Sequence, residues 1–294
     1  MSLIDSLTFF ARHPLTRDAQ ISGMIRFLKW QISSRLAPGA IVHDWVNGSR
    51  FLVRRGDAGL TGNVYAGLHE FREMGYLLHV LREDDLFVDV GANVGSYTIL
   101  ACAAVGCCGV AVEPIPSTYS RLVENVRLNR LEAKVSCLNL AVGKEAGRIA
   151  FTSDLDTANH AVTAPAAGMS TVEVEVGTLD AVLGGRSPTM LKIDVEGFET
   201  AVLEGAHGTL SDPALHSVIM ELNGSGRRYG YDESAIVETM RSLGFESLDY
   251  DPYTRKLRPG VRSDSDNVIF VRDLPRVHER LATSRRVRVL GKEF

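Results

Sequence analysis

Four short apolar runs of this 294-residue chain carry an acidic residue in or directly after their last positions. Short apolar runs bounded by turn residues are typical of buried parallel strands. The acids are Asp89, Glu113, Asp194 and Glu221. Because ligands of open α/β sheets bind outside the carboxyl ends of the strands, these residue positions predict a carboxylate-lined site at one edge of a sheet.

The first run leads into a glycine-bounded turn, Gly91-Ala-Asn-Val-Gly95, and then into a run of small residues typical of a helix. Gly91 lets the chain reverse, and Gly95 lets the helix start lie close to a ligand or to the strand. Asn93 stands where the dinucleotide-binding fingerprint Gly-x-Gly-x-x-Gly has its middle glycine, and asparagine tolerates left-handed backbone. The helix start favours an anionic group, whereas Asp89 favours a cation. Both together predict S-adenosylmethionine, with its carboxylate, ammonium and sulfonium, rather than a pyrophosphate.

Glu113, followed by Pro114, ends the second run 24 residues after Asp89. An acid at this place can accept both hydroxyl protons of a ribose, and the alternative is a surface carboxylate. A nicotinamide-dependent oxidoreductase would use the same acid. The missing middle glycine and Asp89 argue against that enzyme.

The later runs predict where the reaction takes place. Asp194, Glu196 and Glu221 are candidate catalytic residues, since a hydroxyl becomes a good nucleophile only when a nearby base takes its proton. Either Glu221 is the base and Asp194 orients it, or the two hold a divalent metal ion. The metal-free alternative is favoured, because no compact ligand cluster is readable. Asp194 could instead cap the next helix, and Lys192 is expected on the opposite face of its strand.

Further contacts are predicted in three loops. Asn139 and the backbone of Ala141 follow the third strand and are candidate adenine contacts. His160 lies in the polar segment Ser153–Gly168, which either closes over the substrate or is a mobile loop. Arg227 and Tyr229 suit a sugar or an anionic substrate, or belong to an exposed basic turn.

Three signatures occur in order: Asp89–Gly95, Val112–Pro114 and Leu191–Glu199. Together they resemble the FkbM-type S-adenosylmethionine-dependent methyltransferases over about residues 60–272. The resemblance implies a class I (Rossmann-like) α/β fold and O-methylation of a hydroxyl on a sugar-containing or other secondary-metabolite substrate. S-adenosylhomocysteine would be the product. A non-catalytic cofactor-binding protein on the same fold stays an alternative.

We expect a mostly parallel seven-stranded sheet with an antiparallel last strand in a methyltransferase domain of residues 61–275. Helices are predicted over 64–82, 117–129, 198–203 and 234–243, and the strands 245–250 and 267–271 as an antiparallel pair. Residues 1–60 are predicted to form a helical and hairpin extension, with the hairpin turn at Asn47-Gly48. Residues 276–294 are expected to be a solvated basic tail.

The helix of the extension is expected to pack on the core through one apolar stripe, and a membrane-surface or homodimer-forming helix is the alternative. The stripe consists of Ile21, Met24, Ile25, Leu28 and Ile32.

The composition is ordinary for a globular protein, with 45% hydrophobic and 23% charged residues. A net charge of −4 predicts no bulk attraction to nucleic acid or acidic membranes. No apolar segment approaches 18 residues, and the first residues lack a signal-peptide pattern, so a cytoplasmic protein without a membrane span is expected. Four cysteines without metal spacing are expected to be reduced: Cys102, Cys107, Cys108 and Cys137.

Overall fold

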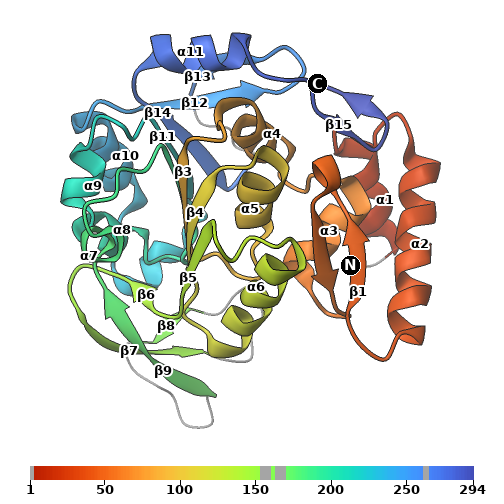
Figure 1. Cartoon of the computed structure of the whole chain (residues 1–294), viewed down its shortest axis with the longest axis horizontal. Coiled ribbons are helices and arrows are strands. Elements are labelled where there is room, and N and C mark those ends of the chain that lie inside the picture. The colour runs from red at the N-terminus through yellow and green to blue at the C-terminus, as the bar shows by residue number, and fades with distance from the viewer. Residues whose placement is uncertain (1–2, 153–159, 163–169, 261–264) are drawn as a thin grey trace.

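A central sheet of eight strands organises the protein (Figure 1), as seen in a computed structural model that describes residues 3–152, 160–162, 170–260 and 265–294. The strand order is β13-β12-β14-β11-β10-β3-β4-β5. The strands are β3 (Leu86–Val90), β4 (Cys108–Val112), β5 (Val135–Leu138), β10 (Met190–Ile193), β11 (Ser217–Glu221), β12 (Glu246–Asp251), β13 (Lys256–Pro259) and β14 (Asn267–Val271).

The chain reverses its direction of travel across the sheet between β3 and β10. It runs outward from β3 through β4 to β5, and then returns to β10 on the other side of β3. Both neighbours of β3 are parallel to it, and Asp89 pairs with Lys192 in register. Such a reversal leaves a crevice at the carboxyl ends of the two central strands, which is the usual ligand position in open α/β sheets.

Strand β14 is antiparallel to both β11 and β12, as predicted for the last strand. The sheet has eight strands rather than the predicted seven, because Lys256–Pro259 forms a hairpin with β12. These residues lie between the two predicted strands 245–250 and 267–271, where no strand was expected. The parallel core, its central reversal and the antiparallel β14 confirm the class I α/β fold.

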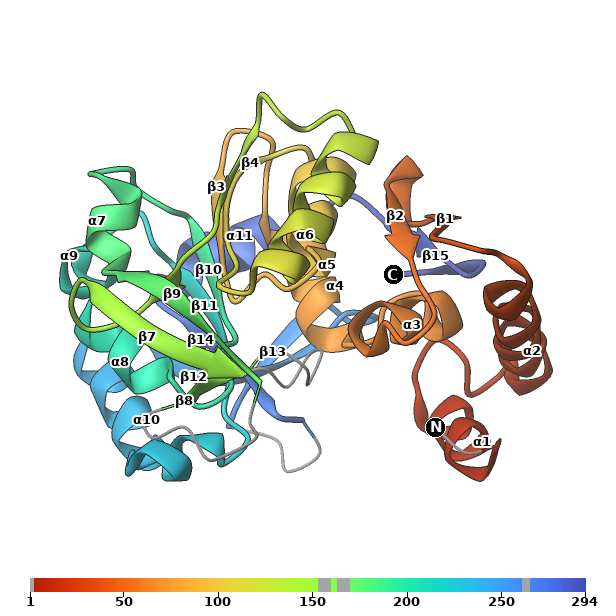
Figure 2. The ribbon, with the colours of Figure 1, turned by 90° about the horizontal axis from the view of Figure 1, so that it is seen from below.

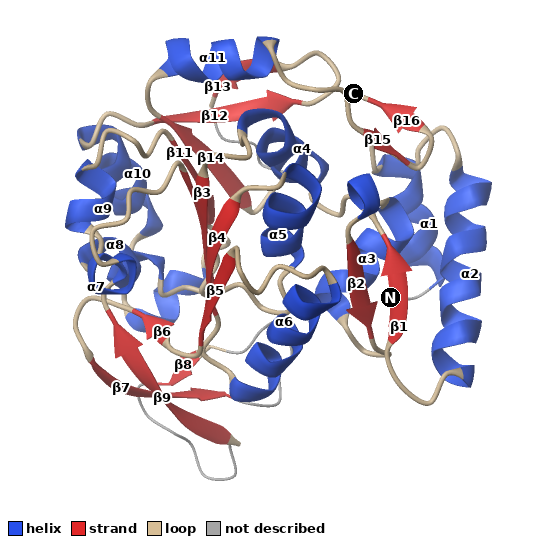
Figure 3. Cartoon of the chain, in the orientation of Figure 1, coloured by secondary structure: helices blue, strands red, loops and turns tan. Residues whose placement is uncertain are grey.

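Helices cover both faces of the sheet (Figures 1 and 3). Alternating side chains of each strand enter two apolar layers, so that Phe87 packs on one face and Val88 on the other. One face carries α4 (Phe71–Val80), α5 (Ser96–Ile99), a π-helical turn (Leu100–Val105) and α6 (Pro116–Leu128). The other carries α7 (Leu179–Leu183), α8 (Glu199–Glu204), α9 (His207–Ser211) and α10 (Glu233–Ser242). The predicted helix 64–82 is divided into α3 (Ala58–Ala66) and α4, because Gly67 ends α3 with a φ of 82°.

A second sheet of four strands lies beside β5, in the order β6-β9-β7-β8 (Figure 1). Its strands are β6 (Ala141–Val142), β7 (Gly147–Thr152), β8 (Ala161–Val162) and β9 (Thr171–Gly177). Strands β7 and β9 pair in antiparallel register along their length. Most of the segment Ser153–Gly168 lies outside the described residues, so its predicted closure over a substrate stays a prediction.

The N-terminal extension contains α1 (Leu3–Arg12), α2 (Gln20–Leu36) and the predicted hairpin of β1 (Ile41–Asp44) with β2 (Arg50–Val53). The expected packing of α2 is wrong. The helix buries Gly23, Phe27 and Trp30 instead, and it leaves the predicted apolar stripe largely exposed. A Cβ at position 23 would lie 2.9 Å from Phe10 Cδ1, so glycine allows the close ring contact that selects this face.

The basic residues after position 275 do not form a solvated tail. They fold back as α11 (Leu274–Ala282) and a small hairpin of β15 (Arg288–Val289) with β16 (Lys292–Glu293). Arg280 pairs through both guanidinium nitrogens with the buried carboxylate of Asp85, and the Phe294 ring packs against Phe71. The buried acid Asp85 and an apolar surface therefore hold this segment on the domain. The number of basic residues in the segment gave no indication of these contacts.

None of the helices in the described part of the chain combines the length and apolarity needed to cross a bilayer.

We predict that Arg280→Ala lowers the free energy of unfolding by about 3–5 kcal/mol, because it leaves the buried Asp85 without its cation. The control is Arg285→Ala in the same segment. The Arg285 pair with Glu83 is exposed, and its loss should change stability by less than about 1 kcal/mol. Urea unfolding of both variants measures the difference, and equal losses would show that the C-terminal segment is not held by Asp85.

Candidate active site

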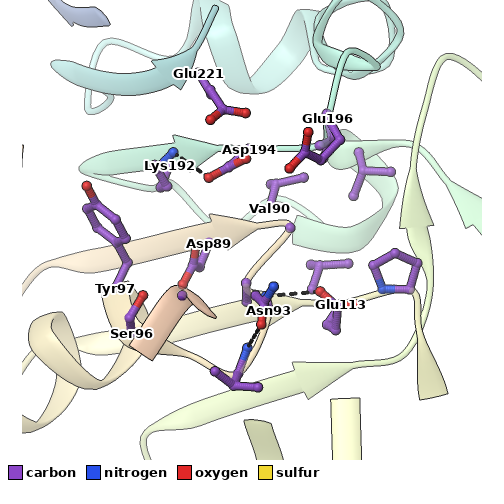
Figure 4. Close-up of a pocket in the computed structure, with 18 of the residues that line it drawn as sticks. Asp89, Val90, Asn93, Ser96, Tyr97, Glu113, Lys192, Asp194, Glu196 and Glu221 are labelled. Carbon is purple, nitrogen blue, oxygen red and sulfur yellow. Dashed lines mark hydrogen bonds and ion pairs between the residues drawn. The ribbon is translucent and has the colours of Figure 1, made fainter. Parts of the chain in front are cut away.

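One cavity of about 330 Å³ opens at the carboxyl ends of β3 and β10 (Figure 4). Most of the residues predicted from the strand ends line it: Asp89, Gly91, Asn93, Glu113, Pro114, Ala141, Asp194, Glu196 and Glu221. The predicted meeting of carboxylates from successive strands is therefore present in the fold.

The turn after β3 brings its backbone against the end of β10. Gly91 has a φ of 80°, and a Cβ there would lie 1.8 Å from the backbone oxygen of Asp194. Asn93 adopts the left-handed backbone expected of it, with a φ of 50°. Gly95 does not line the cavity; a Cβ there would lie 2.6 Å from Leu122 Cδ1, so this glycine allows α6 to pack. Of the two turn glycines, Gly91 lines the cavity and Gly95 supports the packing of α6.

Asp89 and Glu113 hold the turn from two sides. The Asp89 Oδ2 accepts hydrogen bonds from the backbone nitrogen (3.0 Å) and the hydroxyl (2.6 Å) of Thr98. Glu113 accepts from the backbone nitrogens of Asn93 and Ile115, each at 2.9 Å. Burial raises the pKa of Asp89 to about 6 and that of Glu113 to about 7. Glu113 is therefore a buried cavity residue and not a surface carboxylate.

Three further carboxylates form a compact group at the ends of β10 and β11. One oxygen each of Asp194, Glu196 and Glu221 lies within 4.8 Å of the others. Burial, reinforced by the charge of Asp194, raises the pKa of Glu221 to about 9 and that of Glu196 to about 7. Glu196 also has a positive φ of 54°, a backbone strain of the kind that clusters at functional sites.

The Asp194 side chain does not cap the following helix. The Glu199 carboxylate accepts hydrogen bonds from the backbone nitrogens of Val195 (3.2 Å) and Gly197 (3.1 Å) at the helix start. Asp194 faces the cavity instead.

A buried ammonium group, not predicted from the sequence, lies beside the cluster. Lys192 Nζ donates to Asp194 Oδ2 (3.0 Å) and to Asn267 Oδ1 (2.9 Å), and it lies 5.3 Å from the Tyr97 ring centroid. The expectation that Lys192 points to the opposite face is wrong. Residues two apart on a strand share a face, so the spacing to Asp194 was the available signal.

Burial alone would lower the pKa of Lys192, but the surrounding carboxylates more than offset it, and the pKa is raised. Those carboxylates are Asp194, Glu70 and Glu221. Lys192 therefore stays charged.

The network continues to Glu70, the N-cap residue of α4, which also lines the cavity. Asn267 donates to Glu70 Oε1 (2.6 Å), and the Tyr97 hydroxyl donates to Glu70 Oε2 (2.5 Å). Asn267 was missed, although it pairs in register with Glu221 at the start of β14. Because β11 and β14 were both predicted as strands, the position opposite Glu221 in a paired strand could have been examined, and that position is Asn267.

Four predicted contact residues lie outside the cavity lining: Asn139, His160, Arg227 and Tyr229. Asn139 donates to the backbone oxygens of Glu113 (2.8 Å) and Pro114 (2.9 Å), so it braces the loop after β4. The Tyr229 ring lies edge-on to Phe198, which does line the cavity, and its hydroxyl donates to Ala161 O (2.8 Å). Residues 160 and 152 pair through their backbones at the second sheet.

The sequence profile of the methyltransferase FkbM domain matches residues 89–247, from the acid of the first strand to the start of β12. The chain belongs to the FkbM methyltransferase family. This family region contains every catalytic and cofactor candidate named above. It begins after Glu70 and ends before Asn267, so both outer members of the Lys192 network lie beyond it.

A curated protein similar to this family member is the "Hexuronic acid methyltransferase AglP" of Haloferax volcanii. The two are 31% identical over 149 residues, which make up 50% of this chain and 59% of the relative. The match thus spans less than two thirds of that protein.

Solved structures with partial similarity include P. horikoshii TYW2 in complex with MeSAdo (15% identity, TM-score 0.40), where 80% of this chain and 70% of that chain are covered. M. jannaschii TYW2 in complex with AdoMet is 13% identical, with a TM-score of 0.41 and coverage of 80% and 88%.

We predict that Gly91→Ala abolishes the approach of the β3 turn to β10. The added Cβ would overlap the backbone oxygen of Asp194, so the loss in unfolding free energy should be about 4 kcal/mol or more. The matched control is Gly56→Ala, which also has a positive φ but no atom within 4 Å of the added Cβ. It should cost only about 1–2 kcal/mol of backbone strain. Equal losses in urea unfolding would contradict the close contact.

Proposed function

We propose that this protein is an S-adenosylmethionine-dependent O-methyltransferase whose acceptor is a hydroxyl group of a sugar. The observation that carries the proposal is the cavity at the strand ends, where Asp89 and Glu113 flank a glycine turn beside the Asp194–Glu196–Glu221 carboxylates. Membership of the FkbM family supports methyl transfer. The sugar acceptor is supported by the relative named as a hexuronic acid methyltransferase.

The residues of the cavity fit this cofactor. Burial raises the pKa values of Asp89 and Glu113, because it disfavours the ionised form of each carboxylate. A ligand with a cationic group or hydroxyl donors would stabilise that ionised form. Asp89 would face the ammonium group, and Glu113 would accept the ribose hydroxyl protons. An apolar wall suited to an adenine ring lies next to Glu113; it consists of Ile115, Leu140, Ala141, Val142 and Phe151. When bound, S-adenosylmethionine supplies a methyl group on a positively charged sulfur.

The chain itself has to hold the acceptor hydroxyl and take its proton. Glu196 is the best placed base, because its pKa of about 7 makes it both ionised and basic near neutral pH. The Asp194 Oδ2 is already occupied, since it accepts a hydrogen bond from Lys192. Glu221, with its pKa raised to about 9, is protonated and would donate a hydrogen bond to the acceptor oxygen. This division of roles replaces the simpler expectation of Glu221 as the base.

A divalent metal ion is the alternative use of the three carboxylates. Lys192 argues against it, because its buried ammonium already neutralises Asp194 at 3.0 Å. We therefore propose metal-free transfer, for which chelation by EDTA leaves turnover unchanged. Loss of turnover with EDTA and recovery with Mg²⁺ would favour the metal instead.

The first functional prediction concerns separation of binding from chemistry. Asp194→Ala and Glu221→Ala should each lower kcat by about 10²–10⁴-fold, since both remove groups around the reacting hydroxyl. The dissociation constant of S-adenosylhomocysteine should change far less.

Formation of S-adenosylhomocysteine with a methyl hexuronoside and a methyl hexoside as acceptors measures kcat, and calorimetry measures binding. Unchanged turnover in both variants would refute the catalytic assignment. Tight cofactor binding without transfer to either sugar would refute the acceptor class.

The second functional prediction concerns pH. A base acts when deprotonated, so kcat of the wild type should rise about tenfold per pH unit below pH 7 and level off above it, until Glu221 loses its donor proton at about pH 9. Glu196→Gln should be slow throughout and lack this rise. A rise that persists in the Glu196→Gln variant would assign the proton transfer to another group.

A further inference from the structure

Helix α2 carries an exposed apolar face that the fold does not use. We define the α2 stripe as Ile21, Ile25, Leu28, Ile32 and Leu36, whose exposed fractions are 79%, 47%, 48%, 60% and 80%. These residues recur every three or four positions, so they lie along one side of the helix. The opposite side packs on the extension through Phe27 and Trp30. Large exposed apolar patches on soluble proteins mark interaction sites.

The stripe faces away from the catalytic domain. Helix α2 lies at the outer edge of the molecule, with the rest of the N-terminal extension between it and the central sheet (Figures 1 and 2). None of the stripe residues lines the cavity. Of the eight large exposed apolar side chains among the described residues, six lie between residues 20 and 42. Five of these six belong to the α2 stripe, and the sixth, Val42, lies on β1.

The charged side chains of α2 itself all have one sign. No acidic residue occurs between Ala19 and His43, although the whole chain has a net charge of −4. Lys29 and Arg35 are exposed and, at 100° per residue, lie on the two flanks of the stripe. Arg26 turns inward, where its Nε donates to Tyr65 O (2.8 Å). An apolar stripe with basic flanks is the pattern of helices that lie in a membrane interface.

The charges on α2 distinguish two possible partners of the stripe, a lipid bilayer and a second copy of the chain. Two α2 helices packed along their stripes would bring Lys29 and Arg35 of both copies together without an acidic partner on either helix. Anionic phospholipid headgroups complement both residues, while the acyl chains accept the stripe. We propose that α2 docks flat on an anionic bilayer and holds the enzyme at its surface. This inference is independent of the proposed reaction.

The test is co-sedimentation of the full chain with vesicles of phosphatidylcholine, with or without phosphatidylglycerol. The wild type should bind the anionic vesicles and be released by high salt. Lys29→Gln combined with Arg35→Gln should weaken binding about thirtyfold, given the contribution of each basic residue near an anionic surface. Ile25→Ser combined with Ile32→Ser should abolish it. These sites are exposed, so the melting temperature should stay unchanged.

Two control variants match these changes. Arg127→Gln combined with Lys256→Gln removes the same charge on α6 and β13 and should bind like the wild type. Ile25→Leu combined with Ile32→Leu keeps the stripe apolar and should also bind.

Equal binding of the charge variant and its control, or no binding by the wild type, would overturn the proposal. Sedimentation velocity addresses the second copy. A wild-type dimer that Ile25→Ser with Ile32→Ser converts to a monomer, with no vesicle binding, would assign the stripe to self-association and overturn the bilayer assignment.

Discussion

The buried ammonium of Lys192 keeps together a group of carboxylates that would otherwise repel one another. Its bonds to Asp194 and Asn267 connect the end of β10 to β14, and Asn267 extends the connection to Glu70 at the N-cap of α4. A lysine at this depth is stable only when acids surround it, and the acids keep fixed positions only around a cation. Lys192 therefore positions the catalytic candidates, although it need not take part in proton transfer.

The sheet reversal determines where this cluster lies relative to the cofactor residues. Because β3 and β10 are adjacent and parallel, the Gly91 turn meets the Asp194 backbone, and acids from opposite halves of the sheet share one cavity. The resulting gradient of pKa values, from Asp89 at about 6 to Glu221 at about 9, follows from burial and mutual repulsion. One pocket can thereby hold a cation and keep both a base and a hydrogen-bond donor at neutral pH.

The sequence predicted the strand-end acids because apolar runs and turns are local patterns. It did not predict the Lys192–Asn267 and Asn267–Glu70 contacts, which join residues 75 and 197 positions apart. Helical periodicity located an apolar stripe on α2 but could not tell which face of the helix packs. In the structure the face that carries Phe27 and Trp30 is the buried one. The basic C-terminal segment was misjudged for the same reason: its partner, Asp85, is distant in the chain.

Proton release on ligand binding tests the central claim most directly, namely that buried carboxylates with raised pKa values form a cation-binding pocket. Calorimetric titration at pH 7 in buffers of different ionisation enthalpy counts the protons exchanged. A bound cation lowers carboxylate pKa values, so binding should release protons from groups such as Glu113 and Glu196, whose pKa values are about 7. S-adenosylmethionine, with its sulfonium charge, should release more than S-adenosylhomocysteine. Identical heats in all buffers, or proton uptake, would contradict the account.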